Sequence, residues 1–172
     1  IVQSCFDKYA DADMIIFNFR SESEGRRVTK KAKKIGLLNY MNYGAARIAF
    51  RRKSLMYRSV WFTTMFGGGT PHQCGEDSLF IRSCLRAGLK VIVVPEALAS
   101  LSEERESTWF KGYNEKYFFD KGVFLGIAHP RVGKLFARYL VLRHKEYSAQ
   151  SGMSGRKIYR CILRGIKSGK KA

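Results

Sequence analysis

The chain has 172 residues, 45% of them hydrophobic and 13% aromatic, which suffices for a packed core and excludes an intrinsically disordered polypeptide. Its formal net charge of +18 indicates an anionic partner or an anionic surface. The longest apolar candidate, residues 91–101, is interrupted by Pro95 and Glu96 and stays short of the roughly 20 residues that span a bilayer.

Taken in order, the first part of the chain alternates between helical and strand patterns. A helix face at the start is followed by an acidic turn and then by a near-continuous apolar strand, which is typical of a sheet covered on both faces. The pattern predicts helix at 1–10, a turn at 11–13, strand at 14–19, a loop or hairpin tip at 21–34, strand at 47–52 and a helical turn through Leu55 and Met56; residues 37–43 stay open.

The second part continues this alternation and then becomes helical. After a glycine loop the pattern predicts a helix at 76–87 and a buried strand at 90–94, whereas residues 96–105 show no period. We expect helix up to Phe119, a break at 120–122, an apolar stretch at 123–128, an amphipathic helix at 132–142, a Ser/Gly link at 148–155 and a short final helix at 158–166. The predicted class is α/β with a helical C-terminal extension.

The four cysteines and the first residue carry two further expectations. The cysteines form no C-x-x-C motif and no Cys/His cluster, which favours reduced thiols in a cytosolic protein; they are Cys5, Cys74, Cys84 and Cys161. The chain begins with Ile1 in the middle of a helical pattern, so we interpret it as part of a longer protein.

Two adjacent carboxylates, Glu76 and Asp77, stand where the glycine loop becomes the predicted helix. A general base needs a positioned element within reach of the proton that it removes, and a helix N-terminus provides one. The alternative interpretation is that acids in a first turn simply complement the helix dipole, which is worth under about 1 kcal/mol. The preceding loop and the following buried strand favour the first interpretation.

The segment from Cys74 to Phe80, with Gly88–Val91 and Pro95 after it, resembles the "GED" segment of bacterial family 2 glycosyltransferases. The lead-in Phe50-Arg51-Arg52 and Phe62 are similar to that family too. Residues 106–113 resemble the loop and helix that follow in a capsule- and polysaccharide-type branch. The resemblance covers roughly residues 10–126.

This resemblance implies a GT-A fold, which is a doubly wound α/β sheet, and transfer of a sugar from a nucleotide-sugar donor to an acceptor hydroxyl with inversion. It implies that Asp77 is the catalytic base and that Glu76 orients an acceptor hydroxyl. Because the carboxylates are neighbours, each would raise the other's pKa and the pair would titrate jointly.

The family's metal motif, a D-x-D pair, is expected upstream of Ile1, together with the donor-binding half. Asp11-Ala12-Asp13 has the right spacing, but its place directly before the strand at residue 14 resembles a later strand start of the family. We therefore expect no metal ligand in this chain, a divalent Mg or Mn ion only in the full-length protein, and no activity from this part alone.

Two segments are predicted to contact substrate. Gly68 and Gly69 would let backbone approach a ligand or act as a hinge, and His72 would contact donor phosphate or acceptor; a plain connector with a solvated histidine is the alternative. Ser107, Thr108 and Trp109 would form a lid that stacks on a sugar, or else a helix cap with a core tryptophan.

Beyond residue 130 the chain holds twelve lysines and arginines against Glu146 as the only acid. Basic amphipathic helices are typical of membrane-surface elements, which suits a lipid-linked glycan acceptor. We therefore predict an acceptor-side domain at 1–130, a basic helical tail at 131–172, and a location in the cytoplasm, peripheral to the inner face of the bacterial membrane. The alternative is a basic binding module for nucleic acid or anionic membrane without catalysis, although no RNP, KH or zinc-finger motif supports nucleic acid.

Overall fold

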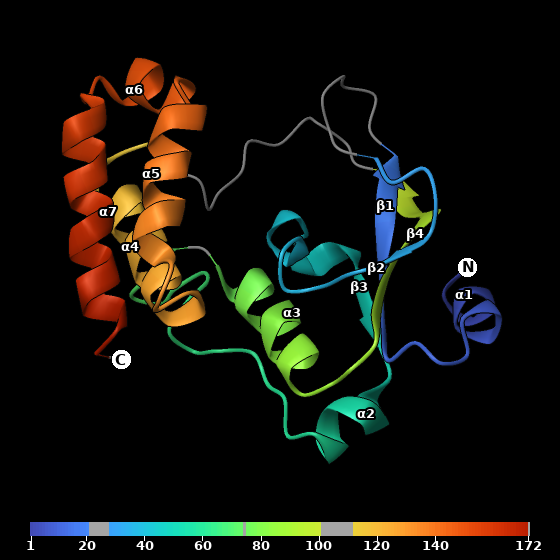
Figure 1. The fold of residues 1–172 in the computed structure, drawn as a ribbon. Coiled ribbons are helices and arrows are strands. Elements are labelled where there is room, and N and C mark those ends of the chain that lie inside the picture. The colour runs from blue at the N-terminus through green and yellow to red at the C-terminus, as the bar shows by residue number, and fades with distance from the viewer. Residues whose placement is uncertain (21–27, 74, 101–111, 172) are drawn as a thin grey trace. The chain divides into compact units, whose positions relative to one another are not determined.

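The computed structural model describes residues 1–20, 28–73, 75–100 and 112–171 (Figure 1). The chain forms two compact units: the first comprises Ile1–Thr63 and Asp77–Glu106, and the second comprises Thr64–Glu76 and Ser107–Ala172. The first unit holds a mixed sheet with helices and the second holds helices and one long loop, so the protein is of the α/β class. The boundary at residue 130 stays a prediction.

The sheet of the first unit has four strands in the order β2-β4-β1-β3. Strands β1 and β4 pair in parallel, whereas β3 pairs antiparallel with β1 and β2 antiparallel with β4. The strands are β1 (Met14–Arg20), β2 (Lys33–Lys34), β3 (Ile48–Phe50) and β4 (Val91–Ser100). The predicted strands at 14–19, 47–52 and 90–94 are thereby confirmed.

Strand β4 is longer than its sequence pattern predicts, because it continues through Pro95 to Ser100. The register with β1 shifts between Ile16 and Asn18, which admits the proline that cannot donate to a ladder. The buried Asn18 side chain compensates there by donating to the carbonyls of Pro95 and Thr29, both at 2.9 Å, and accepting from the Thr29 amide at 3.0 Å. The residues after Pro95, for which the lack of a period gave no prediction, therefore belong to the strand as far as Ser100.

Apolar side chains cover both faces of this sheet, as the near-continuous apolar strands predict. One face packs with α1 (Val2–Lys8) in a cluster of Cys5, Phe6, Ala12, Ile15, Phe17, Ile92 and Val94. The alternate strand residues Met14, Ile16, Val91 and Val93 are buried as well. Figure 1 shows α1 and α3 (Glu76–Arg86) on opposite sides of the sheet.

The aspartates of the D-x-D pattern are engaged in the fold of the first unit. Asp13 accepts hydrogen bonds from the Lys90 amide at 2.8 Å and from the Ser54 hydroxyl at 2.6 Å. It thus joins the starts of β1 and β4 to α2 (Arg52–Tyr57). Asp11 forms a surface ion pair with Lys90 Nζ at 3.2 Å, which lowers the pKa of its carboxyl.

The two remaining short helical segments of the first unit lead into β3. They are 3₁₀ turns at Tyr40–Asn42, within the stretch whose pattern stayed open, and at Ala45–Arg47, directly before β3. Tyr40 is fully buried, and burial raises the pKa of its hydroxyl to about 12. Burial likewise raises the pKa of the Cys84 thiol on α3 to about 12. Cys5, Cys84 and Cys161 are free and buried thiols.

The described residues of the second unit form four helices and the loop that precedes α3. The helices are α4 (Glu115–Ala128), α5 (Gly133–Arg143), α6 (Glu146–Ser151) and α7 (Gly155–Gly169). Asn114 caps α4 by accepting from the Tyr117 amide at 2.9 Å, and Ser154 caps α7 by accepting from the Lys157 amide at 3.3 Å. Among the described residues, no helix is long and apolar enough to cross a membrane.

Helices α4 and α7 lie side by side and approach each other through glycines (Figure 1). A Cβ built on Gly122 would lie 2.1 Å from the Ile162 carbonyl oxygen, and one on Gly165 would lie 2.0 Å from that of Phe119. Backbone contact of this kind requires glycine on both helices. The predicted break at 120–122 is therefore wrong: Gly122 stays helical because its bare Cα is the contact surface.

Helix α5 confirms the helix predicted at 132–142, with its apolar side chains on two sides. Ala137 is buried and Phe136 and Leu140 are half-buried, whereas Leu135, Tyr139 and Leu142 are exposed. A helix with apolar residues on one side only would bury all of them. The final helix, α7, extends further than predicted and buries its apolar side.

Candidate acidic site and histidine pocket

Asp77 lies in the first turn of α3, and the direction of that helix fixes which edge of the sheet it reaches. The end of α3 is tied to the start of β4, because the Leu89 amide donates to the Cys84 carbonyl at 3.0 Å and Val91 pairs with Met14 at the start of β1. The helix therefore runs opposite to the two parallel strands. Its first turn points toward their carboxyl ends, where open α/β sheets bind ligands.

The surroundings of Asp77 support this placement independently. A Cβ on Gly44 would lie 3.5 Å from Asp77 Oδ2, so the carboxylate stands beside the loop that precedes β3. Since β3 runs antiparallel to β1, with Ile48 opposite Ile16, this loop lies toward the carboxyl end of β1. The Arg47 guanidinium accordingly sits 5.5 Å from the Phe19 ring centre. Sequence reasoning missed Gly44, which no motif marks.

Glu76 belongs to the second unit, where its side chain lies against the glycine loop. A Cβ on Gly67 would be 3.3 Å from the Glu76 carboxyl carbon, and Gly67 itself has a φ of +112°. A side chain at Gly67 would therefore be strained and would crowd the carboxylate. The two neighbouring acids thus have different surroundings: Gly44 for Asp77 and Gly67 for Glu76.

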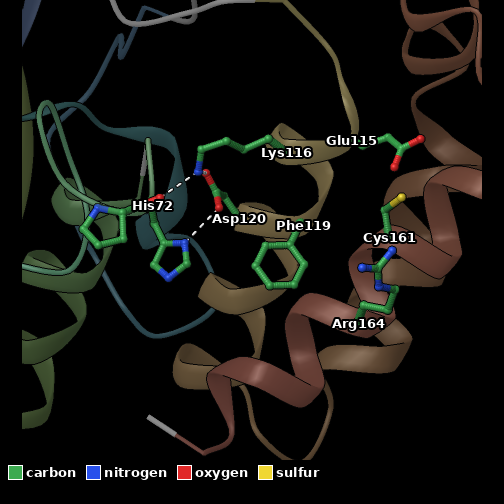
Figure 2. A pocket seen from close by; sticks show the side chains of 8 residues that line it. His72, Glu115, Lys116, Phe119, Asp120, Cys161 and Arg164 are labelled. Carbon is green, nitrogen blue, oxygen red and sulfur yellow. Dashed lines mark hydrogen bonds and ion pairs between the residues drawn. The ribbon is translucent and has the colours of Figure 1, made fainter.

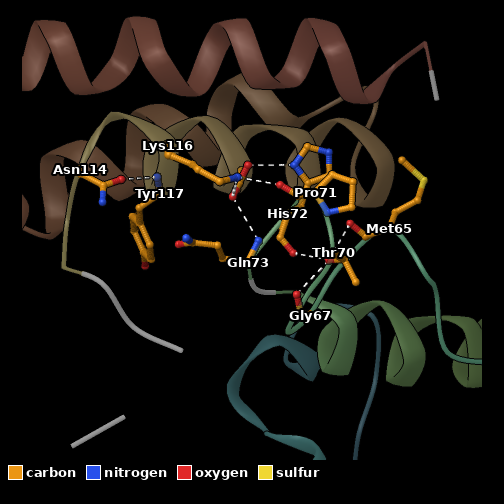
Figure 3. Close-up of polar contacts among 10 residues, drawn as sticks. Met65, Gly67, Thr70, Pro71, His72, Gln73, Asn114, Lys116 and Tyr117 are labelled. Carbon is orange, nitrogen blue, oxygen red and sulfur yellow. Dashed lines mark hydrogen bonds and ion pairs between the residues drawn. The ribbon is translucent and has the colours of Figure 1, made fainter. Parts of the chain in front are cut away.

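The glycine loop, for which a plain connector was the alternative interpretation, is closed by backbone hydrogen bonds (Figure 3). The Gly67 amide donates to the His72 carbonyl at 2.8 Å, and the His72 amide donates to the Met65 carbonyl at 3.2 Å. The Thr70 hydroxyl lies 2.9 Å from the carbonyl oxygens of Gly67 and His72. Gly68 and Gly69 form the exposed tip of this closed loop.

His72 is held by a carboxylate that sequence reasoning missed. Asp120 on α4 is fully buried, and the Nδ1–H of His72 donates to its Oδ1 at 2.8 Å, because a carboxylate can only accept. The other oxygen accepts from Lys116 Nζ at 2.8 Å and from the Gln73 amide at 3.1 Å. Figure 3 shows these bonds converging on one carboxylate, which ties the loop to α4. The imidazole's orientation is thereby fixed.

This cluster lines a pocket of about 300 Å³ in the second unit (Figure 2). Its wall consists of Pro71, His72, Glu115, Lys116, Phe119, Asp120, Cys161 and Arg164. Glu115 pairs with Lys157 at 2.6 Å, which lowers the pKa of its carboxyl, while burial raises the pKa of the Cys161 thiol. The pocket therefore combines an apolar wall with a fixed imidazole and with side chains of both charges, since Glu115 and Asp120 stand beside Lys116 and Arg164, which suits a polar ligand.

Two expectations remain to be compared with the structure: the lid residues and the metal ligands. Ser107, Thr108 and Trp109 lie outside the described residues, so the lid stays a prediction. Within the described ranges no group of three or more His, Cys, Asp or Glu side chains is arranged to hold a metal ion. Asp11 and Asp13 are engaged with Lys90 and Ser54, and the divalent ion that the resemblance implies upstream of Ile1 stays a prediction.

Comparison with known proteins adds no family to this description. No protein-family model matches the chain, and no curated protein matches it significantly.

Proposed function

We propose that this chain is the acceptor-side part of an inverting family 2 glycosyltransferase, which moves a sugar from a nucleotide-sugar donor to a hydroxyl of a lipid-linked glycan. The observation that carries the proposal is the position of Asp77. Its carboxylate lies in the first turn of α3, toward the carboxyl ends of the parallel strands β1 and β4, and faces a loop that bears only a glycine there. That position suits a base that acts on a bound ligand.

In the proposed reaction Asp77 accepts the proton of the acceptor hydroxyl as that oxygen attacks the anomeric carbon of the donor. The new glycosidic bond forms on the face opposite the departing nucleoside diphosphate, whose bond to the sugar breaks with its electron pair. Glu76 orients an acceptor hydroxyl by accepting a hydrogen bond. No described residue is assigned to a metal ion, and no step here depends on one.

His72 is the proposed contact for a hydroxyl of the acceptor in the second unit, because its second ring nitrogen can accept a hydrogen bond. The Nδ1–H of His72 donates to Asp120, and the second ring nitrogen, Nε2, lies on the side of the imidazole that faces away from Asp120 (Figure 2). A histidine whose tautomer and orientation are set by a carboxylate is suited to a directional contact. Asp120 would act as a positioning residue for this contact.

Asp77→Asn in the full-length protein tests the role of the base. Transfer from UDP-, GDP- and TDP-linked radiolabelled sugars to a membrane extract of the native host is measured, with label in the lipid fraction as the readout. We expect kcat to fall about 10²–10⁴-fold, the usual contribution of general base catalysis. Glu76→Gln should reduce transfer less, because its neighbour still removes the proton.

The matched control is Asp7→Asn, since Asp7 is an exposed carboxylate whose side chain accepts from Gln3 on α1. It should retain full transfer, and thermal unfolding should show that all three variants are folded. Transfer by Asp77→Asn within twofold of the wild type would sink the assignment of the base.

A second candidate function is a non-catalytic basic binding module, which the net charge of +18 favours. In that case Glu76 and Asp77 only complement the dipole of α3. It predicts strong binding to nucleic acid or to anionic membrane and unchanged behaviour of Asp77→Asn.

A further inference from the structure

Helix α5 exposes a continuous apolar stripe. Leu135, Tyr139 and Leu142 are 68%, 58% and 69% exposed, and their spacing of four and three residues places them on one side of the helix. Val132, at the start of the helix, extends the stripe and is exposed as well. Single exposed apolar residues are ordinary on a protein surface, but an aligned set marks an interaction surface.

Cationic side chains flank this stripe. Lys134 and Arg138 lie along one side of it, and Arg143 lies at the end of the helix near Leu142. All are exposed, and in the described part of the chain none forms an ion pair with a carboxylate. Glu146, which follows the end of the helix, bonds to His144 at 2.5 Å, and this bond, together with the charge of Arg143, lowers the pKa of the Glu146 carboxyl. The stripe therefore lies in a field that attracts anions.

The stripe continues into a groove between α5 and α7. This groove has a volume of about 350 Å³ and is lined by Arg138, Val141, Leu142, Gly155, Arg156 and Tyr159. Arginines thus stand on both helices beside apolar walls. A ligand with an apolar body and an anionic head would fill such a groove while its charge meets a guanidinium.

These features select one class of occupant. A second copy of the same surface would bring the unpaired arginines and lysines against each other, which is unfavourable. A nucleic-acid backbone would meet the cations but would leave the leucines without apolar contact. An anionic lipid leaflet offers both phosphate head groups and acyl chains, as interfacial helices require.

We propose that the outward side of α5, with the α5–α7 groove, docks the protein onto an anionic phospholipid bilayer, with Leu135, Tyr139 and Leu142 inserted at the level of the head groups. This deepens the proposed function, because it names the surface that would bring the chain to a lipid-linked acceptor. It assigns the contact to α5, since α7 uses its apolar side against α4 and keeps Ile158, Ile162 and Ile166 buried.

The test is flotation of the full chain with vesicles of 30 mol% phosphatidylglycerol in phosphatidylcholine, compared with pure phosphatidylcholine. A triple variant, Leu135→Gln, Tyr139→Gln and Leu142→Gln, removes the apolar stripe without removing charge. We expect its partition coefficient on the anionic vesicles to fall at least tenfold. A second variant, Lys134→Gln with Arg138→Gln, should lose binding on anionic vesicles and should show a weaker dependence on salt.

The matched control is Leu37→Gln, Leu38→Gln and Tyr57→Gln, because these exposed apolar residues belong to the first unit. It should bind vesicles like the wild type, and circular dichroism should show all variants folded. The proposal is overturned if the α5 triple variant binds vesicles as well as the wild type does, or if the control variant loses as much binding as the α5 variant. So does conversion of an oligomer into a monomer by the α5 variant, or tighter binding of α5 to duplex DNA than to vesicles. Sugar transfer is not the readout, so failure here and failure of the Asp77 test are distinguishable.

Discussion

At the scale of single residues, Asp120 is the side chain with the most demanding surroundings. A carboxylate without exposure to water is tolerated only when donors surround it. Its donors are His72, Gln73 and Lys116, and Lys116 also donates to the Pro71 carbonyl at 2.6 Å. Two of these donors come from the loop and one from α4, so the carboxylate fixes the loop on the helix.

We expect Asp120→Ala to lower the free energy of unfolding by about 3 kcal/mol, because removing one partner of a buried ionic cluster strands the others. Urea denaturation followed by circular dichroism measures this change. Asp11→Ala is the matched control, since it breaks an exposed pair with Lys90 and should change stability little. Equal stability of the two variants would show that the buried cluster contributes nothing.

The sequence indicates a helical ion pair of Asp120 with Lys116, but it does not predict that the Asp120 carboxylate is buried. Lys116 and Asp120 are four residues apart with opposite charge, which is a helical signal. The following Gly122, however, favoured a turn. Whether a carboxylate is buried depends on what packs over it, and here that is a loop some fifty residues earlier in the chain. The local sequence pattern around Asp120 therefore cannot predict this contact.

At the scale of secondary structure elements, the crossing of α4 and α7 depends on glycines at 122, 126, 165 and 169. A Cβ on Gly126 would lie 2.6 Å from the Ile166 carbonyl oxygen, and one on Gly169 would lie 2.3 Å from that of Val123. The obstacles are backbone atoms, which no rotamer change removes. The two helices can lie this close only without side chains at these positions.

We therefore expect Gly165→Ala to destabilise the second unit by about 3 kcal/mol, at the upper end of the usual cost of overpacking. Hydrogen exchange should show faster exchange of the amides of α4 and α7. Gly36→Ala is the control, because a Cβ there meets nothing within 4 Å and should alter stability by less than about 0.5 kcal/mol. Unchanged protection in Gly165→Ala would contradict the close crossing.

Elements with strong periodicity could be predicted, whereas those shaped by tertiary contact could not. Strand β1 and helix α3 follow their apolar patterns closely. The end of β4 does not follow such a pattern, because a register shift and the hydrogen bond from Asn18 to the Pro95 carbonyl accommodate the proline within the sheet. For α5 the period was right but the sequence could not say which apolar residues face inward. Asp77 was singled out by its motif, and its place toward the carboxyl ends of β1 and β4 follows from the direction of α3, whereas its role stays a prediction.

At the scale of the whole molecule, much of the charge of +18 lies beyond residue 130, where twelve lysines and arginines face one acid, but exposed cations occur in both units. In the first unit exposed cations occur on β2, at Lys33 and Lys34, and on α2, at Arg52 and Lys53. In the second unit they occur on α5 and α7. On α5 they adjoin the exposed apolar stripe of Leu135, Tyr139 and Leu142, whereas on α2 the exposed Met56 and Tyr57 lie one turn from Arg52 and Lys53. Charge without such a stripe attracts any polyanion at low salt, whereas charge with it favours a lipid surface.

This distribution predicts weak, salt-sensitive binding to nucleic acid. The measurement is fluorescence anisotropy with a labelled 20-bp duplex, titrated between 50 and 300 mM NaCl. We expect the duplex to dissociate below physiological salt, because each phosphate contact that releases a counterion contributes about −0.9 to the slope of log K against log salt. Vesicle binding should fall less over the same range, since the apolar contact of Leu135, Tyr139 and Leu142 does not depend on salt. Lys134→Gln with Arg138→Gln should weaken both by a similar factor, whereas the α5 triple glutamine variant should weaken only the vesicle binding. Nanomolar duplex binding that survives physiological salt would instead favour the nucleic-acid module and would leave the apolar stripe of α5 without its proposed role.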